Sequence, residues 1–182
     1  MITRVLVTGL PASGKSTLGT ALATVLNMRC HDKDRFLEAL FARHGEISPA
    51  DRTALSREAD TAFIELASQP VDAVLVSWWR HPRSATESGT PTGWSGNVPG
   101  ATVELHCHCD PDVALARFSA RRRHRGHGDA QRDTAALARS FHEQAALGPL
   151  GLGPLVQVDT HGAVDVEAVA RQVRAAHAQA AD

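Results

Sequence analysis

Short apolar runs alternate along the chain with longer segments in which apolar residues recur every three or four positions. The short runs predict β-strands that are buried on both faces, at 2–7, 28–31, 71–77, 101–107 and 155–158. The longer segments predict amphipathic helices, each with one apolar stripe. Strands that alternate with helices predict a parallel sheet covered on both faces, with ligands at the carboxyl ends of the strands.

Turn and capping signals indicate where several of these elements begin. Ser48 is a typical N-cap, with Pro49 at the first helical position and Asp51 completing a capping box. Asp110 and Pro111 mark another helix start. Residues 80–100, between the third and fourth strands, are rich in Pro, Gly, Ser and Thr and are long for a loop. Loops of this length are usually functional or disordered.

Composition and charge narrow the possibilities. With 182 residues, 43% of them hydrophobic, the chain is expected to form one α/β domain over 1–182. A formal net charge of −1 provides no general basic field for nucleic acid. The apolar opening is too short for a signal segment or a membrane span. Three cysteines without a paired pattern favour a reducing, cytoplasmic location, and nothing in the sequence sets the oligomeric state.

A complete phosphate-binding motif, G-x-x-x-x-G-K-[ST], follows the first predicted strand. It consists of Gly9, Leu10, Pro11, Ala12, Ser13, Gly14, Lys15, Ser16 and Thr17. Glycines permit the tight backbone that aims successive N–H groups at phosphate oxygens. Lys15 is predicted to bridge the β- and γ-phosphates of ATP, and the Ser16 hydroxyl to ligate Mg²⁺. A chance glycine turn is disfavoured because the motif lies between a predicted strand and a predicted helix.

Two aspartates follow the second predicted strand, at the same sheet edge as the phosphate loop. Asp32 is predicted to help hold the Mg²⁺ shell, and Asp34 to accept the proton of an attacking hydroxyl. The opposite division of these two roles stays open. The simpler alternative is a helix start at which either carboxylate caps free N–H groups. Capping alone does not require two carboxylates.

The phosphate loop and the run D-K-D-R-F-L-E at 32–38 resemble the small-metabolite and antibiotic kinases of the P-loop superfamily. Similar proteins are shikimate kinase, gluconate kinase, chloramphenicol phosphotransferase and the polynucleotide 5′-hydroxyl kinases. The resemblance covers most of the chain, although only the phosphate loop is highly specific. It implies a five-stranded parallel sheet of order 2-3-1-4-5, with ATP and Mg²⁺ as cofactors.

Arginines cluster after the fourth strand, where the resemblance implies a lid at about 121–131. Such a lid closes over the nucleotide, excludes water and brings guanidinium groups to the transferred phosphoryl group. We expect Arg121 and Arg125 to make this contact, with Arg117 behind them. A solvated basic helix end and a nucleic-acid patch are the alternatives.

The third predicted strand ends in Ser77, without the acidic residue of a Walker B site, which argues against motor ATPases. Trp78 and Trp79 would either wall an acceptor pocket or pack over the sheet. Arg80 would pair with an anionic acceptor or face solvent. Asp159, after the last strand, is expected beside the adenine, as in related kinases.

The cluster of histidines and cysteines at 106–109 is not expected to form a zinc site. In a strand, the histidines would face one way and the cysteines the other, so four ligands would not converge.

The sequence thus predicts a three-layer α/β/α phosphotransferase that moves the γ-phosphoryl group of ATP to a hydroxyl of a small molecule. The 80–100 loop would shape the acceptor site, and sugars, sugar acids, nucleosides and antibiotics stay open. One alternative is a kinase of nucleic-acid 5′-hydroxyls, which the net charge disfavours. Another is a nucleotide-binding regulatory module without an acceptor, which the pair Asp32 and Asp34 disfavours.

Overall fold

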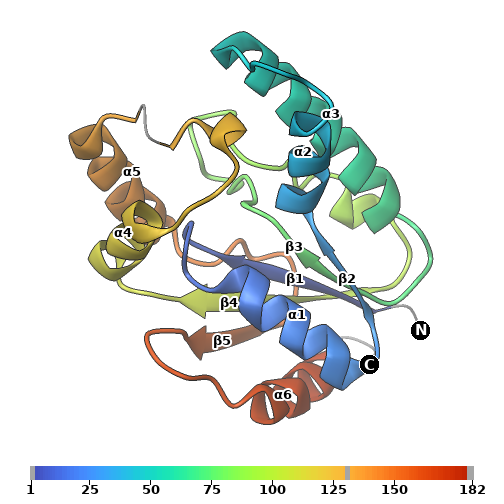
Figure 1. Cartoon of the computed structure of the whole chain (residues 1–182). Helices are drawn as coiled ribbons and strands as arrows, with labels where there is room; N and C mark the ends of the chain where they lie inside the picture. The colour runs from blue at the N-terminus through green and yellow to red at the C-terminus, as the bar shows by residue number, and fades with distance from the viewer. Residues whose placement is uncertain (1–2, 130–131, 180–182) are drawn as a thin grey trace.

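The fold is built around one parallel β-sheet (Figure 1). The computed structural model describes residues 3–129 and 132–179, and its five strands lie in the order β2-β3-β1-β4-β5. Every neighbouring pair is parallel, which confirms the predicted fold class and strand order. The strands are β1 (Thr3–Gly9), β2 (Arg29–Asp32), β3 (Ala73–Val76), β4 (Ala101–His108) and β5 (Leu155–Asp159).

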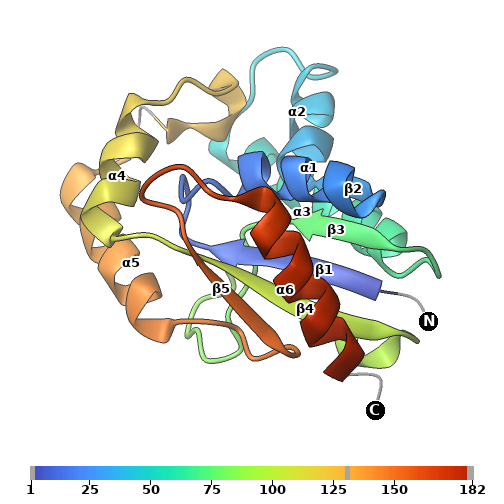
Figure 2. The ribbon, with the colours of Figure 1, turned by 90° about the horizontal axis from the view of Figure 1, so that it is seen from below.

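Helices cover both faces of this sheet, as Figures 1 and 2 show. On one face, α1 lies beside α6; on the other, α2 packs with α3 and α4 packs with α5. The helices are α1 (Lys15–Leu26), α2 (Lys33–Phe41), α3 (Pro49–Ala67), α4 (Pro111–Ala120), α5 (Thr134–Leu147) and α6 (Val166–Gln179). Two short 3₁₀ turns, η1 (Ser95–Asn97) and η2 (Arg125–His127), complete the described elements.

Alternation along the strands sorts the core into two layers. In β1, Val5 and Val7 pack into the cluster that contains α1 and α6, whereas Leu6 packs with Phe63 and Ala67 of α3. Because both faces are covered, the strand reads as a continuous apolar run in the sequence.

Arg4 is a charged side chain within this core and is fully buried. Its guanidinium donates hydrogen bonds to the carbonyl oxygens of Ala67 (2.8 Å), Pro99 (2.7 Å) and Gln69 (3.2 Å). Carbonyl groups at the end of a helix lack N–H partners within the helix, and Arg4 donates the missing hydrogen bonds at the end of α3. The apolar pattern of the first strand did not predict this contact.

Residues 77–100 form a folded loop rather than a structureless one. The Thr90 N–H donates to the Trp78 carbonyl and the Arg80 N–H donates to the Thr90 carbonyl, both at 2.8 Å. Gly89 has a φ of 94°, and a Cβ there would lie 2.9 Å from the Trp78 oxygen. At Gly89 the chain turns back, and the two hydrogen bonds of Thr90 hold it against the residues that follow β3.

The element boundaries differ little from those predicted. β1 extends two residues further, to Gly9, and Ile2 lies outside the described residues. β3 begins two residues later than predicted, at Ala73. The capping box between Ser48 and Asp51 is present at the start of α3. Within the two described ranges, no helix combines the length and apolar character that crossing a membrane requires.

Candidate active site

The phosphate loop joins β1 to α1, which confirms the strand–loop–helix setting of the motif. Gly9 (φ 126°) and Gly14 (φ 89°) adopt backbone conformations that favour glycine, and a Cβ on Gly9 would lie 2.5 Å from the Cys107 oxygen. No side chain caps the start of α1 at Gly14. The buried Ser13 hydroxyl has no hydrogen-bond partner among the described residues. Free N–H groups and an unpaired hydroxyl at a helix N-terminus suit an anionic ligand.

Lys15 bends back over this loop. Its ammonium donates to the carbonyl oxygens of Leu10 (2.6 Å) and Gly9 (3.0 Å). Burial lowers the pKa of Lys15 to about 8. The loop thus holds a desolvated amine that phosphate oxygens would stabilise as a cation.

Asp32 ends β2 and caps α2, since its Oδ1 accepts the Asp34 N–H at 3.0 Å. Burial raises the pKa of the Asp32 carboxyl, and a hydrogen bond from the Ser16 hydroxyl partly offsets this rise. The capping role considered from the sequence is therefore present. Contact with Ser16 also places Asp32 beside the predicted metal ligand.

Asp34 lies in the first turn of α2 and pairs with an arginine from the predicted lid. Its Oδ2 accepts from Arg123 Nη1 at 2.9 Å, while its Oδ1 has no hydrogen-bond partner in residues 3–129 and 132–179. Arg123 also grips Asp129 through two bonds of 2.9 and 3.0 Å. This two-carboxylate contact orients Asp34 and leaves one of its oxygens free for a substrate hydroxyl.

Arg121 also reaches this site. Its guanidinium carbon lies 4.3 Å from the centre of the Phe118 ring, and burial, with a contribution from the nearby Arg123 charge, lowers its pKa to about 10. The buried Nε of Arg121 has no hydrogen-bond partner among the described residues. A partly buried guanidinium that lines a cavity is suited to phosphoryl oxygens.

The segment 121–129 docks on α2. Gly126 is buried against the Phe41 ring, on which His124 stacks with ring centres 5.4 Å apart. His127 meets the same ring edge-on and contacts Glu38 Oε1 at 3.1 Å. The described part of the predicted lid therefore packs against the helix that carries Asp34; positions 130 and 131 lie outside the described residues.

The arginines in this segment differ in placement from the expectation. α4 ends at Ala120, and Arg121 is extended (φ −74°, ψ 149°), so side chains alternate from there. Arg121 and Arg123 line the site together, whereas Arg125 is exposed in η2 and does not line it. Of the two arginines expected at the transferred phosphoryl group, the structure places Arg121 in the site and Arg125 outside it. Arg132, which sequence reasoning missed, joins the site from beyond this segment.

These groups surround a phosphate cavity of about 330 Å³, lined by the loop, Asp32, Asp34 and four arginines. Of these, Arg117 donates to the carbonyl oxygens of Thr160 (2.9 Å) and His161 (2.7 Å). Asp159 is bound to His161 and mostly exposed, and it does not line the cavity. Its predicted place beside the adenine stays a prediction.

The Ser16 and Asp32 oxygens are hard donors of the kind that Mg²⁺ prefers. In the part of the chain that the structure describes, no cluster of three or more His, Cys, Asp or Glu residues could hold a metal by itself. A site with few protein oxygens suits Mg²⁺, which keeps water and binds substrate phosphates.

Ser77, at the place of a Walker B carboxylate, belongs to a buried polar chain. Its hydroxyl lies 2.6 Å from the Thr90 hydroxyl, which donates to Asp60 at 2.6 Å. Asp60 also pairs with Lys33 at 3.0 Å. Because Thr90 gives its hydrogen to the carboxylate, Ser77 must donate to Thr90. Ser77 therefore offers only lone pairs to the phosphate cavity.

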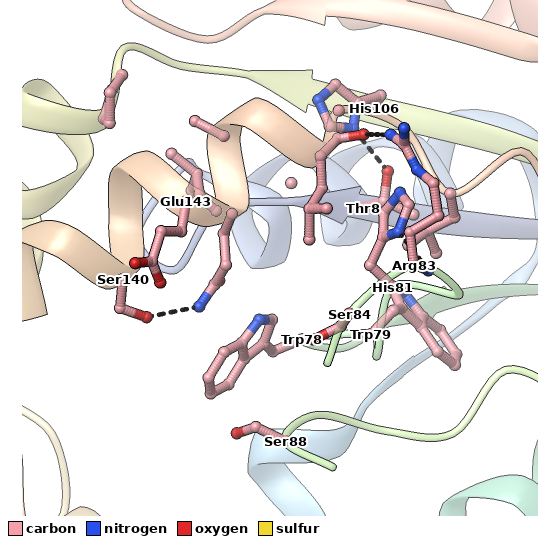
Figure 3. A pocket seen from close by; sticks show the side chains of 18 of the residues that line it. Thr8, Trp78, Trp79, His81, Arg83, Ser84, Ser88, His106, Ser140 and Glu143 are labelled. Carbon is pink, nitrogen blue, oxygen red and sulfur yellow. Dashed lines mark hydrogen bonds between the residues drawn. The ribbon is translucent and has the colours of Figure 1, made fainter. Parts of the chain in front are cut away.

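A second cavity, also of about 330 Å³, lies between α5, the end of β4 and the segment after β3 (Figure 3). Trp78 lines both cavities. Trp79 is buried and donates from Nε1 to the Val7 carbonyl at 3.0 Å, so much of it packs over the sheet. Arg80 donates to the Glu87 carbonyl and lines neither cavity.

Solved structures with this architecture span nearly the whole chain. A candidate kinase from Chloroflexus aurantiacus has a TM-score of 0.76 and 24% identity, over 98% of this chain and 97% of that chain. A gluconokinase from Sinorhizobium meliloti has a TM-score of 0.55 and 21% identity, over 97% and 92%. A shikimate kinase from Bacteroides thetaiotaomicron has a TM-score of 0.53 and 19% identity, over 96% and 98%.

The fold is that of the P-loop small-molecule kinases. The expected resemblance is confirmed at the level of fold. At these identities the likeness establishes the fold alone. No protein-family model and no curated protein sequence matches the chain.

Proposed function

We propose that the chain is an ATP-dependent phosphotransferase that acts on a hydroxyl of a small molecule. The observation that carries the proposal is the convergence of Lys15, Arg121 and Asp34 on one cavity. Lys15 is held only by backbone carbonyls, and the Arg121 Nε has no partner among the described residues. Two cations poised for an anion, opposite a carboxylate with a free oxygen, suit phosphoryl transfer.

In the proposed reaction, backbone N–H groups of the loop bind the triphosphate. Asp34 Oδ1 accepts the proton of the acceptor hydroxyl, whose oxygen forms a bond to the γ-phosphorus as the bond to the β-phosphate oxygen breaks. The products are the phosphorylated acceptor and ADP. Lys15 and Arg121 stabilise the charge that spreads over the γ-phosphoryl oxygens.

Mg²⁺ would be held by the Ser16 hydroxyl, with Asp32 contacting its shell, and would neutralise phosphate charge. Ser77, which lines the same cavity, would offer an acceptor to water bound there. Residues 121–129 act as the lid, and their docking on α2 keeps Arg123 against Asp34. The three cysteines are free, which fits the reducing cytoplasm as the location.

ADP release should be measured with MgATP and a panel of sugars, sugar acids, amino sugars, nucleosides, cyclitols, antibiotics and an oligonucleotide. The Asp34→Asn variant should lower acceptor-dependent turnover by about 10²- to 10⁴-fold, because it lacks the general base. Its affinity for ATP, measured by calorimetry, should stay near that of the wild type. Glu58→Gln, an exposed charge change on α3, is the matched control.

Unchanged turnover in Asp34→Asn would assign the base elsewhere. Slow ADP release that no member of the panel stimulates would contradict the transferase proposal and favour a nucleotide-binding module. Stimulation by the oligonucleotide alone would favour the polynucleotide kinase alternative.

A further inference from the structure

A chain of polar side chains runs from the interface of α2 and α3 to the edge of the phosphate cavity. At its start, Lys33 donates to the Ser56 hydroxyl at 2.9 Å and pairs with Asp60 at 3.0 Å. At its end, Thr90 is fully buried, and its hydroxyl lies 2.6 Å from both Asp60 and Ser77. The chain thus connects α2, α3 and the loop after β3 to Ser77, which lines the cavity.

The hydrogen bonds of this chain run in one direction. The Lys33 ammonium can only donate, and the Asp60 carboxylate can only accept. Thr90 gives its single hydroxyl hydrogen to Asp60, so it can only accept from Ser77. Among the described residues, Thr90 is the one hydrogen-bond partner of the Ser77 hydroxyl. The Ser77 hydrogen is therefore turned toward Thr90, and its lone pairs are left for the cavity.

Ser77 lies beside the predicted metal ligands. β3 runs between β1 and β2, and Val76 pairs in register with Val7 on one side and with Asp32 on the other. Ser77 is the next residue along β3. It therefore reaches the sheet edge at which Asp32 accepts a hydrogen bond from the Ser16 hydroxyl.

A hydroxyl that can only accept selects the group that it meets. Ionised phosphate oxygens carry no hydrogen, so the Ser77 lone pairs would repel them. Mg²⁺ bound to substrate phosphates usually keeps several water molecules, and each of these can donate. Lys15 is another donor of the cavity, but its ammonium already donates to the Leu10 and Gly9 carbonyls. Metal-bound water is thus the partner that suits Ser77.

We infer that Thr90 is a positioning residue for the metal site. Held by Asp60, Thr90 keeps the lone pairs of Ser77 turned toward the phosphate cavity, where Ser77 accepts a hydrogen bond from water bound to the Mg²⁺ of the nucleotide. This role rests on the proposed function, which supplies the bound MgATP. It gives the loop after β3 a part in nucleotide binding, in addition to the wall that Trp78 forms between the two cavities.

The contribution of the metal to nucleotide affinity tests the inference. It is the ratio of the dissociation constants of a non-hydrolysable ATP analogue in EDTA and in saturating Mg²⁺, both measured by calorimetry. Ser77→Ala should lower this ratio by about twofold to tenfold, the range for one hydrogen bond. Thr90→Val removes the hydroxyl, keeps the shape of the side chain and should lower the ratio by up to the same factor. Thr90→Ser keeps the hydroxyl and should keep the wild-type ratio.

A double variant separates positioning from an independent effect. Ser77→Ala combined with Thr90→Val should show the same ratio as Ser77→Ala alone, because Thr90 acts through Ser77. Thr61→Val is the matched control, since Thr61 is exposed on α3 and its hydroxyl donates to the Arg57 carbonyl of its own helix at 3.1 Å. It should leave the ratio unchanged.

Four results would overturn the inference. In the first, the losses in Ser77→Ala and Thr90→Val add in the double variant. In the second, Thr90→Val lowers the unfolding midpoint in urea but not the ratio, which would limit Thr90 to a structural role. In the third, Ser77→Ala weakens binding equally in EDTA and in Mg²⁺, which would make Lys15 the partner of Ser77. In the fourth, the wild-type ratio is near one. Absence of acceptor-stimulated ADP release would contradict the transferase proposal alone, since the binding ratio needs no acceptor.

Discussion

Replacing Gly126 by alanine tests whether the segment 121–129 must dock on α2 for turnover. A Cβ at this position would lie 2.7 Å from two ring carbons of Phe41 and 2.9 Å from the Ile47 Cδ1. Ordinary contact begins at 3.4 Å, so the segment and the ring must separate by 3.4 − 2.7 = 0.7 Å. Phe41 is almost completely buried, and it therefore has little room to yield.

Overpacking of this kind typically costs about 1–3 kcal/mol. Applied to docking alone, the cost would lower the ratio of docked to undocked protein by about 5- to 150-fold. Arg123 would then spend less time against Asp34. If the undocked form becomes predominant, we expect the acceptor-dependent kcat/KM to fall by up to the same factor as the ratio of docked to undocked protein.

Two measurements check the expectation, namely turnover and the rate of tryptic cleavage within 121–129. Cleavage should accelerate as the open form becomes more populated. Gly96→Ala is the control, because a Cβ there would meet nothing within 4 Å. Unchanged cleavage and unchanged turnover in Gly126→Ala would refute docking on Phe41. Faster cleavage with full turnover would show that docking is not needed for catalysis.

Two further predictions concern pH and stability. The kcat/KM for ATP should fall as pH rises through about 8, because Lys15 of the free enzyme loses its proton there; a flat profile from pH 7 to 9.5 would contradict this. Glu104→Gln should lower the free energy of unfolding in urea by about 1–3 kcal/mol, because the buried carboxylate accepts the Leu150 and Gly151 N–H groups at 2.7 and 2.8 Å. An unfolding midpoint equal to that of the wild type would show that these bonds are dispensable.

The arrangement of the elements could be predicted because its signals are local. Strand and helix periods, the capping box at Ser48 and the glycine motif each lie within a few consecutive residues. The phosphate loop needs only its own sequence and the two elements that flank it. Asp32 and Asp34 follow, since the carboxyl ends of parallel strands meet at one sheet edge.

The rest of the site depends on contacts between distant segments. The sequence predicted Arg121 and Arg125 but not Arg123, because an uninterrupted basic run gives no sign that α4 ends at Ala120. The second cavity requires α5 to lie opposite the segment after β3, and no pattern in either predicts this. The burial of Arg4 depends on its hydrogen bonds to the Ala67 and Gln69 carbonyls, which lie more than 60 residues away in the sequence.

The wall shared by the two cavities has an optical consequence. The chain contains three tryptophans and no tyrosine, and all three tryptophans lie between positions 78 and 94. Trp79 and Trp94 have ring centres 6.3 Å apart, and Trp78 lines the cavities directly. The intrinsic ultraviolet emission of the protein thus arises almost entirely from this one region. Titrating unlabelled protein in a fluorimeter would report occupancy beside Trp78, without a dye and without turnover.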